Sequence, residues 1–334
     1  MRRLLSIVGG GSWGTALAMV LAPRFEGVRL WVYEEDLAAR MRSGRVNDVY
    51  LPGFALPANV DVVNDLAAAL DGSGTVLSVM PSHLVRQMYE QMLPLLNPSM
   101  VFVSATKGLE NGTLLRMSEV IREVVSRRFE PAVAVISGPT FAREVAAGHP
   151  AALVVASADV GVAEGVQAAL SGPTFRPYSS TDPVGVEIGG AMKNVVAIGA
   201  GVCHGLGLGS NSLAALITRG LAEMMRLAAA MGARRDTLAG LAGMGDLVLT
   251  CTGELSRNRA VGLELARGRC LDEIVRSRRM VAEGVKTTRA AVELAERFGV
   301  ETPISASMHE VLHFGASPQE AIRKLMERSL KTEY

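Results

Sequence analysis

The sequence predicts an α/β domain with a mostly parallel sheet in its first half and an all-α domain in its second half. Two observations support this division. Up to about residue 180, short apolar runs alternate with helical patterns, which is typical of a parallel sheet covered by helices on both faces. After Asp182-Pro183 only helical patterns remain. A chain of 334 residues is long for one core, so we expect two domains, residues 1–184 and 185–334.

The elements of the first domain follow from short apolar runs and the helical patterns between them. The predicted strands are 4–8, 28–32, 75–79, 101–104, 133–137, 152–156 and 174–178. The predicted helices are 12–21, 36–43, 82–96, 114–127 and 160–170. In such a sheet, ligands bind at the carboxyl ends of the strands.

The second domain is expected to contain no strand. Residues 184–203 are small and apolar and predict one long buried helix, which a glycine-rich loop follows at 205–209. Further helices are expected at 212–231, 257–267, 271–278, 287–298, 304–314 and 318–331. The last of these helices has a clear N-terminal signal, with Ser317 as N-cap, Pro318 at the first helical position and Glu320 completing a capping box.

A glycine pattern at the chain start predicts a Rossmann-type dinucleotide-binding domain. Gly9, Gly11 and Gly14 form G-x-G-x-x-G between the first strand and the first helix, the context that makes this motif specific. Gly9 allows the tight turn, Gly11 lets the backbone approach a pyrophosphate, and Gly14 lets the helix pack on the strand. The helix start, at Ser12 and Trp13, then offers N–H groups to the phosphates.

Composition excludes several other classes of protein. The formal net charge is +1, from 34 basic and 33 acidic residues, and no basic block suggests nucleic acid or an anionic membrane as partner. The first apolar run is too short for a signal peptide, and no uncharged apolar run reaches the roughly 18 residues that span a bilayer. Cys203, Cys251 and Cys270 are scattered, without C-x-x-C, which fits the reducing cytoplasm.

Lys193 is the charge most indicative of function, because it lies in the otherwise apolar helix pattern 188–198. Burial of an ammonium group is costly and favours its neutral form. A desolvated lysine can therefore serve as a general base. The alternative is a lysine whose ammonium group extends from a core helix to water.

Two further segments follow strands, where the fold places ligands. Lys107 comes after the strand 101–104, and its alternative is an ordinary loop lysine. Gly138 and Thr140 follow the strand 133–137 and offer a backbone N–H and a hydroxyl, although a structural Gly-Pro turn explains the same residues.

In the second half, Asp246 and the segment Ser256-Arg257-Asn258 are candidates for substrate binding. Asp246 follows a glycine-rich connection and either balances a buried lysine charge or caps the next helix. A helix start with Ser, Arg and Asn is suited to phosphate, and an N-cap serine beside a solvated arginine is the alternative.

His309-Glu310-Val311-Leu312-His313 matches H-E-x-x-H, the zinc-protease helix. Only 21 residues follow His313, which leaves little room for a third ligand and a substrate cleft. We therefore interpret it as an amphipathic surface helix, and we expect no metal site.

Taken together, these segments resemble bacterial-type NAD(P)-dependent glycerol-3-phosphate dehydrogenase over nearly the whole chain. The matching blocks are Gly9–Gly14, Pro81-Ser82-His83, Ala105–Glu110, Ile136–Ala142, Gly189–Gly201, Leu216–Met224, Leu241–Thr252, Ser256–Asn258 and Val281–Gly284. Several blocks in the right order are more specific than any one. The resemblance implies a Rossmann domain followed by a helical half like that of 6-phosphogluconate dehydrogenase.

The resemblance also implies a reaction, the reversible interconversion of sn-glycerol 3-phosphate and dihydroxyacetone phosphate with NAD(P)(H), which supplies phospholipid synthesis in the cytoplasm. It implies that Lys193 accepts the proton and that Lys107 touches both cofactor and substrate. By the same resemblance, the remaining substrate contacts are Gly138, Thr140, Asp246, Ser256, Arg257 and Asn258, supported by Asn194 and Thr250. The implied cofactor contacts, besides the glycines, are Ser12, Trp13, Tyr33, Ala142, Arg257, Val281 and Glu283.

The choice between NADH and NADPH stays open from the sequence. The second strand leads into Tyr33 and Glu34, and an acid here binds a ribose 2′-hydroxyl and repels a 2′-phosphate. Some family members carry a basic residue at the position of Tyr33, which this chain lacks, and Arg40 is the next arginine able to reach. Because Glu34 lies beyond the strand end and is able to turn outward, we expect both cofactors to support turnover. Oligomeric state stays open as well, a homodimer being one option.

Two other functions are compatible with parts of the sequence. A related reductase of a small 2-keto acid such as ketopantoate shares both halves and a lysine, but has no need of Ser256-Arg257-Asn258. A non-catalytic dinucleotide sensor would not need Lys193.

Overall fold

The structure, a computed structural model, describes residues 4–276, 282–330 and 332–333. The chain forms two compact units. Unit 1 comprises residues up to Glu110 together with Leu115–Glu187, and unit 2 comprises Asn111–Leu114 and the residues from Ile188 onward.

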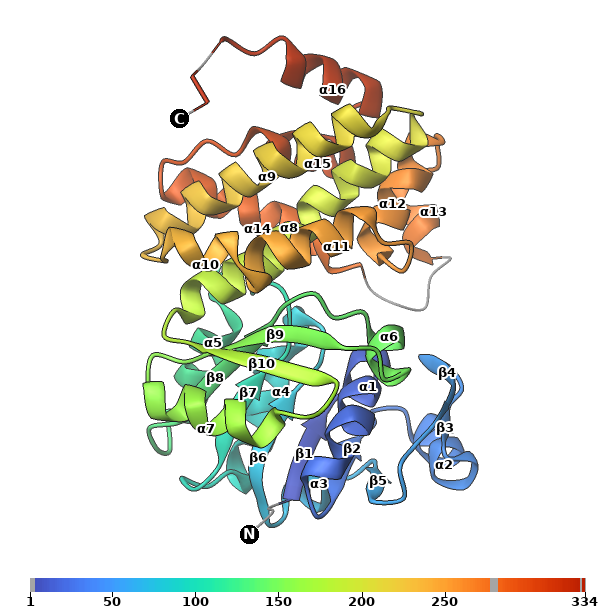
Figure 1. Ribbon diagram of the computed structural model, residues 1–334, viewed down its shortest axis with the longest axis vertical. Helices are drawn as coiled ribbons and strands as arrows, with labels where there is room; N and C mark the ends of the chain where they lie inside the picture. The colour runs from blue at the N-terminus through green and yellow to red at the C-terminus, as the bar shows by residue number, and fades with distance from the viewer. Residues whose placement is uncertain (1–3, 277–281, 331, 334) are drawn as a thin grey trace. The chain divides into compact units, whose positions relative to one another are not determined.

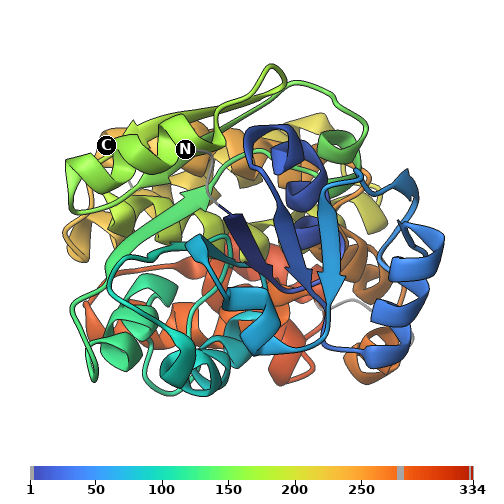
Figure 2. The same ribbon diagram turned by 90° about the horizontal axis from the view of Figure 1, so that it is seen from below.

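Unit 1 is built on an eight-stranded sheet in the order β10-β9-β8-β7-β6-β1-β2-β5 (Figures 1 and 2). All neighbouring strands are parallel except the pair β8 and β9. The strands are β1 (Leu4–Val8), β2 (Val28–Trp31), β5 (Val60–Val63), β6 (Ser73–Ser78), β7 (Val101–Ser104), β8 (Ala132–Ser137), β9 (Ala151–Ala156) and β10 (Phe175–Ser180). The sequence prediction of a mostly parallel sheet is confirmed.

Helices cover both faces of this sheet. One face packs against α1 (Ser12–Leu21), α2 (Glu35–Gly44), α6 (Ala142–Ala146) and α7 (Val160–Leu170). The other packs against α3 (Leu66–Leu70), α4 (Val85–Met92) and α5 (Met117–Val125). Strand alternation explains the two cores, because Leu5 and Ile7 of β1 join the first and Val8 joins the second.

The sequence analysis missed the short elements of unit 1 and set some boundaries wrongly. It missed the hairpin of β3 (Val46–Asn47) and β4 (Leu51–Ala55), the edge strand β5, and the five-residue helices α3 and α6. The helix expected at 82–96 is divided into η2 (Ser82–Leu84), α4 and η3 (Leu93–Leu95), the last containing a proline in its first turn. The helix expected from residue 114 begins at Met117, because Leu114 has a left-handed φ of 63°.

The secondary-structure elements in the described part of unit 2 are all helices (Figure 1). Its helices are α8 (Pro183–Gly205, which begins in unit 1), α9 (Ser210–Ala230), α10 (Arg235–Ala239), the π-helix η4 (Leu241–Gly245), α11 (Asp246–Thr252), α12 (Arg257–Ala266), α13 (Leu271–Arg276), α14 (Glu283–Arg297), α15 (Pro303–His313) and α16 (Pro318–Met326). The sequence analysis missed α10, η4 and α11, because glycines at 240, 243 and 245 interrupt the helical pattern. Among the described residues, α8 is the one helix long and apolar enough to cross a membrane, and its apolar window is entirely buried in the protein.

Candidate active site

The glycine turn of unit 1 requires glycine at two of its three motif positions for internal reasons. Gly9 has a φ of 126°, and a Cβ there would lie 2.1 Å from the backbone oxygen of Val79. A Cβ on Gly14 would lie 1.9 Å from the backbone oxygen of Gly9, so this glycine lets α1 pack on the turn. Gly11 has open space where its Cβ would stand. Its lack of a side chain therefore leaves room for a ligand close to the backbone.

The N-terminus of α1 faces this open space without a side-chain cap. Gly11 is the N-cap residue, and no side chain accepts hydrogen bonds from the first N–H groups of the helix. Ser12 and Trp13 follow, both half-buried. An uncapped helix start beside an open glycine suits an anionic group such as a pyrophosphate, so the residues present fit a dinucleotide.

Lys107 and the segment 138–140 lie together in unit 1, at the ends of β7 and β8. The Lys107 ammonium donates a hydrogen bond to the carbonyl of Gly138 at 3.0 Å, and the Thr140 hydroxyl donates to the same carbonyl at 3.1 Å. Gly138 has a φ of 154°, and a Cβ on it would lie 2.7 Å from the Cα of Leu153. Lys107 is therefore held by the strand ends instead of extending freely into solvent.

Ala142 follows this segment closely in the sequence. It is the first residue of α6, and it is half-buried. Tyr33, beyond the end of β2, is 76% exposed, with its ring edge-on to Trp31 at a centroid distance of 6.0 Å. Both side chains remain accessible to a ligand.

In unit 2, Lys193 is buried in an ion pair. It is 6% exposed on α8, and its ammonium contacts the Asp246 carboxylate and donates to the Thr250 hydroxyl at 2.9 Å. Asp246 is fully buried, and Thr250 donates to the backbone oxygen of Asp246 at 2.6 Å. The ammonium group of Lys193 thus does not extend to water, and Asp246 does not cap α11 but balances the lysine charge.

Close helix packing brings this pair together. Asp246 begins α11 directly after the π-helix η4, a rare element that often occurs at functional sites. A Cβ on Gly189 of α8 would lie 2.5 Å from the backbone oxygen of Ala242, and one on Gly243 would lie 2.0 Å from that of Leu238. Gly189 therefore allows α8 to approach η4 closely enough for Lys193 to meet Asp246, and Gly243 allows η4 to pack on α10.

Asn194 and Asn258 form a buried amide relay in unit 2. Asn194 donates to the Gly190 carbonyl at 3.3 Å and accepts from the Asn258 amide at 2.9 Å. Asn258 in turn accepts from the backbone N–H of Gly284 at 3.0 Å. The relay connects α8, α12 and the start of α14, and it fixes the backbone next to Lys193.

The start of α12 carries the predicted phosphate-binding residues. Ser256 is buried and is the N-cap, since its hydroxyl accepts from the N–H of Arg259 at 3.2 Å. The Arg257 side chain is exposed. The protein around it removes part of the water from its guanidinium and so lowers its pKa, whereas the charge of Glu283 raises it. The N-cap interpretation of Ser256 is therefore correct, and Arg257 is the exposed cation at this helix start. Val281 lies outside the described residues.

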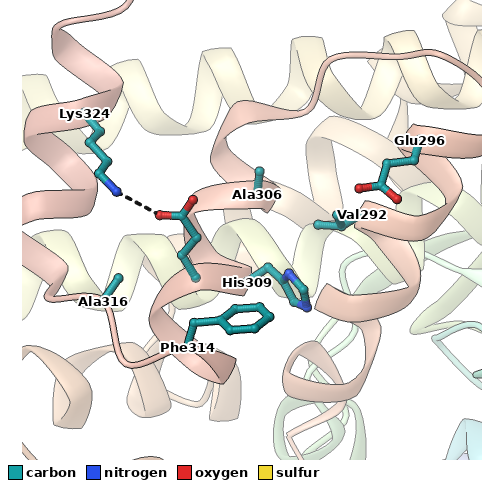
Figure 3. Close-up of a pocket in the computed structure, with 8 residues that line it drawn as sticks. Val292, Glu296, Ala306, His309, Phe314, Ala316 and Lys324 are labelled. Carbon is teal, nitrogen blue, oxygen red and sulfur yellow. Dashed lines mark hydrogen bonds and ion pairs between the residues drawn. The ribbon is translucent and has the colours of Figure 1, made fainter.

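The H-E-x-x-H segment lies on α15 of unit 2, beside a groove of about 560 Å³ (Figure 3). The groove is lined by Val292, Glu296, Ala306, His309, Glu310, Phe314, Ala316 and Lys324. Glu310 pairs with Lys324 at 3.2 Å, and the His309 ring meets Phe314 edge-on. Throughout the residues that the structure describes, no group of three or more His, Cys, Asp or Glu side chains is arranged to hold a metal ion.

The sequence analysis missed two buried residues, one that holds the glycine turn and one on the same helix as Lys193. Asn47 donates to the Gly10 carbonyl and to the Thr15 hydroxyl, each at 2.8 Å, and so holds the glycine turn. Glu187 is buried six residues before Lys193, where it pairs with Arg116 at 2.6 Å and accepts hydrogen bonds from Ser118. Glu187 could have been found from the sequence, because it is a charged residue within the apolar pattern of α8. The residues next to Asn47 in the sequence give no such indication.

Fold and site together define a dinucleotide-dependent oxidoreductase with a Rossmann unit and a helical unit that carries a buried lysine. Residues 5–163 and 182–323 match the N-terminal and C-terminal domains of NAD-dependent glycerol-3-phosphate dehydrogenase. The chain belongs to this family.

Relatives match over the full length. A glycerol-3-phosphate dehydrogenase (NAD(P)+) of Koribacter versatilis is 57% identical, with 98% of each chain covered. The crystal structure of glycerol-3-phosphate dehydrogenase from Coxiella burnetii has a TM-score of 0.93 at 41% identity, covering 98% of this chain and 99% of that one. A ketopantoate reductase from Ralstonia eutropha shares the fold with a TM-score of 0.60 at 14% identity, covering 96% of this chain and 99% of that one.

Proposed function

We propose that this chain interconverts sn-glycerol 3-phosphate and dihydroxyacetone phosphate with NAD(P)(H). The observation that carries the proposal is the buried Lys193–Asp246 pair of unit 2, in a chain whose unit 1 has an open, uncapped glycine turn. Full-length similarity to enzymes of this name supports the same substrate.

Lys193 moves the proton at the C2 oxygen. In reduction its ammonium donates this proton to the oxygen of the ketone, and in oxidation the amine takes it back from the hydroxyl. Asp246 and Thr250 both contact the Lys193 ammonium. These two contacts orient the Lys193 side chain and stabilise its ammonium form, which is the form that donates the proton.

Lys107 polarises the same oxygen. Its contact with the Gly138 carbonyl holds the ammonium at the end of β7, where we propose that it meets the substrate and the cofactor. Gly138 and Thr140 are proposed as neighbouring substrate contacts.

Arg257 binds the phosphate. The guanidinium at the start of α12 provides two parallel donors, and the helix dipole adds to its attraction for a dianion. Ser256 caps this helix, while Asn258 and Asn194 brace it against α8. Binding the remote phosphate positions C2, so this interaction increases kcat as well as affinity.

Gly9, Gly11, Gly14, Ser12 and Trp13 hold the dinucleotide, together with Tyr33, Ala142, Arg257, Val281 and Glu283. When bound, its nicotinamide ring supplies the hydride acceptor or donor. We place the enzyme in the cytoplasm, as a source of glycerol 3-phosphate for phospholipids, because its three cysteines are free thiols. The oligomeric state stays open, with a homodimer as one option, and light scattering measures it.

The test is consumption of NADH or NADPH by the purified full chain with three ketones. We expect rapid turnover with dihydroxyacetone phosphate, and almost none with dihydroxyacetone or ketopantoate. Turnover of ketopantoate in preference to the phosphorylated ketone would refute the proposal. Cofactor binding without turnover of any ketone would favour the sensor alternative.

A further inference from the structure

Two histidines of unit 2 that the proposed reaction does not use lie next to each other on α15. His309 and His313 are four residues apart, so their side chains share one face of the helix. The centroids of the two rings are 4.9 Å apart, and the ring planes are inclined at 58°. His309 is half-buried and lines the groove of Figure 3, while His313 is exposed.

The distance between the rings is the one that a shared metal ion requires. A zinc–nitrogen bond of about 2.1 Å places the metal about 3.2 Å from the centroid of an imidazole ring. Two imidazoles bound at the tetrahedral angle then have centroids about 5 Å apart. The observed distance between His309 and His313 agrees with this value, so α15 need not deform for both rings to bind one ion.

The neighbouring helix orients the His313 ring. Burial lowers the pKa of His313, the charges of His309 and Arg289 lower it as well, and a hydrogen bond to the backbone of Val285 on α14 opposes them. The lowered pKa favours the neutral imidazole, which is the form that binds metals. Because the bond to the Val285 carbonyl engages one ring N–H, the other ring nitrogen carries the lone pair. Metal-binding histidines usually have this arrangement.

The charged residues around the two histidines favour a cation on balance. Lys324 lines the groove and pairs with Glu310 at 3.2 Å. Arg289 pairs with Glu293 at 2.8 Å. Each of these two positive charges is therefore balanced by a carboxylate, and Glu296, which also lines the groove, adds a further negative charge.

We propose that His309 and His313 bind a divalent transition-metal ion such as Zn²⁺, with water in the remaining coordination positions. Imidazole nitrogen suits Zn²⁺, whereas Mg²⁺ prefers oxygen ligands. The expectation of no metal site concerned the third ligand and the substrate cleft of a protease, and a site with two protein ligands needs neither. The ion fixes the His313 ring and with it the bond to Val285, so it strengthens the contact between α14 and α15.

The primary test is a calorimetric titration of the purified full chain with Zn²⁺ and, separately, with Mg²⁺. Half of the binding free energy of a four-ligand zinc site corresponds to a dissociation constant between roughly 1 and 200 µM, which is the range we expect for Zn²⁺. Mg²⁺ should not bind in this range. A dissociation constant for Zn²⁺ above about 1 mM, or equal affinities for the two ions, would overturn the proposal.

His309→Gln and His313→Gln locate the site. Each variant should weaken Zn²⁺ binding by at least about tenfold, the smallest effect usual for disturbing a metal-binding histidine. The matched controls are His149→Gln, at an exposed histidine of unit 1, and Cys270→Ser, at the exposed thiol, and both should keep the wild-type affinity. Unchanged affinity in both His309→Gln and His313→Gln would refute the site.

Thermal unfolding followed by circular dichroism tests the contact between α14 and α15. Without metal, all four variants should unfold near the wild-type Tm, which shows that they are folded. Saturating Zn²⁺ should raise the Tm of the wild type through preferential binding to the folded chain, and should raise that of His309→Gln far less. Equal shifts in these two proteins would refute the stabilising role. Because neither ketone nor dinucleotide is present, the outcome is independent of the proposed reaction.

Discussion

At the scale of single residues, the defining feature is a lysine ammonium buried with a carboxylate in a helical core. Lys193 is 6% exposed and Asp246 is fully buried. Breaking a buried ion pair by removing one partner leaves an uncompensated charge and is strongly destabilising. Variants at this pair therefore need a folding control beside every rate measurement.

We expect Lys193→Ala to lose about two to four orders of magnitude in kcat, the usual effect of removing a general acid or base. Cofactor dissociation constants, measured by fluorescence, should stay near those of the wild type. The limb of the kcat–pH profile that belongs to Lys193 should disappear. Near-normal turnover by a folded Lys193→Ala chain would exclude the assignment.

Asp246→Asn should keep the shape of the site while removing the charge that supports the Lys193 ammonium. We expect kcat for ketone reduction to fall by roughly a hundredfold, within the range of acid–base effects. Thr250→Val is the companion variant. It removes one hydrogen bond to the ammonium but no charge, so its kcat should fall less. Equal losses in the two variants would argue against an electrostatic role for Asp246.

The residues of the candidate site were predictable to different degrees. The glycines of the turn and Lys193 were identifiable because a specific spacing and a charge in an apolar helix are local signals. Asn47 was not, because its partners Gly10 and Thr15 lie 37 and 32 residues away in the chain. Asp246 remained ambiguous until its contact with Lys193 was seen.

At the scale of elements, the approach of α8 to η4 determines the geometry of the site. Gly189→Ala should shift η4, because its Cβ would lie 2.5 Å from the backbone oxygen of Ala242. We expect a loss of about 1 to 3 kcal/mol in unfolding free energy, the usual effect of overpacking, and a kcat at least tenfold lower. Gly199→Ala is the control on the same helix, since the nearest atoms to its Cβ would belong to the Leu216 side chain, at 3.4 Å, and to the Met308 sulfur, at 3.6 Å. Comparable activity in both alanine variants would show that this close approach is unimportant.

A buried carboxylate joins α9 to the start of α15. Glu223 accepts hydrogen bonds from the N–H groups of Ile304 and Ser305 and from the Ser305 hydroxyl, at 2.6 to 3.2 Å. Burial raises the pKa of Glu223 to about 7, against these hydrogen bonds, which lower it. The folded chain thus holds a proton that the unfolded chain has released between about pH 4.5 and 7.

The stabilisation linked to this proton is present below pH 4.5 and is lost as pH rises through 7. Relative to Glu223→Gln, which does not titrate, the wild-type unfolding free energy should fall by roughly 3 kcal/mol from pH 4.5 to 8. Urea unfolding of both proteins across this range measures the difference. Parallel pH curves would contradict the raised pKa.

Element prediction succeeded where the pattern was long. The helices 12–21 and 160–170 have the bounds that the sequence predicts. The prediction failed for α10, η4 and α11, because glycines required for close packing interrupt the periodic pattern of apolar residues there. It also failed for the edge strand β5, in which Asp61 interrupts a short apolar run.

At the scale of the whole molecule, the division into a sheet unit and a helical unit was predictable because the hydrophobic pattern changes once along the chain. The activity was less predictable from the sequence. Neither unit by itself specifies a phosphorylated substrate, and the glycine turn would serve any dinucleotide enzyme. The substrate assignment depends on Arg257 at the start of α12 and on similarity to relatives over the full length.

Both NADH and NADPH should support turnover. If kcat/KM for the two cofactors differed by more than about a thousandfold, roughly 4 kcal/mol, the residues at the end of β2 would discriminate strongly between a 2′-hydroxyl and a 2′-phosphate. Steady-state rates with NADH and NADPH at saturating dihydroxyacetone phosphate measure this ratio. Such a ratio would show that the expectation of dual use is wrong.

The central claim is that this molecule acts on a phosphorylated ketone, and a four-way comparison tests it most directly. Wild type and Arg257→Ala are each assayed with dihydroxyacetone phosphate and with dihydroxyacetone. We predict that the variant loses about 3 kcal/mol or more in kcat/KM on the phosphorylated ketone, with kcat lowered and KM raised, since a bidentate contact to a dianion is strong. On dihydroxyacetone, the small wild-type rate should fall little further. Equal losses on both substrates would show that Arg257 does not read the phosphate, and would contradict the account.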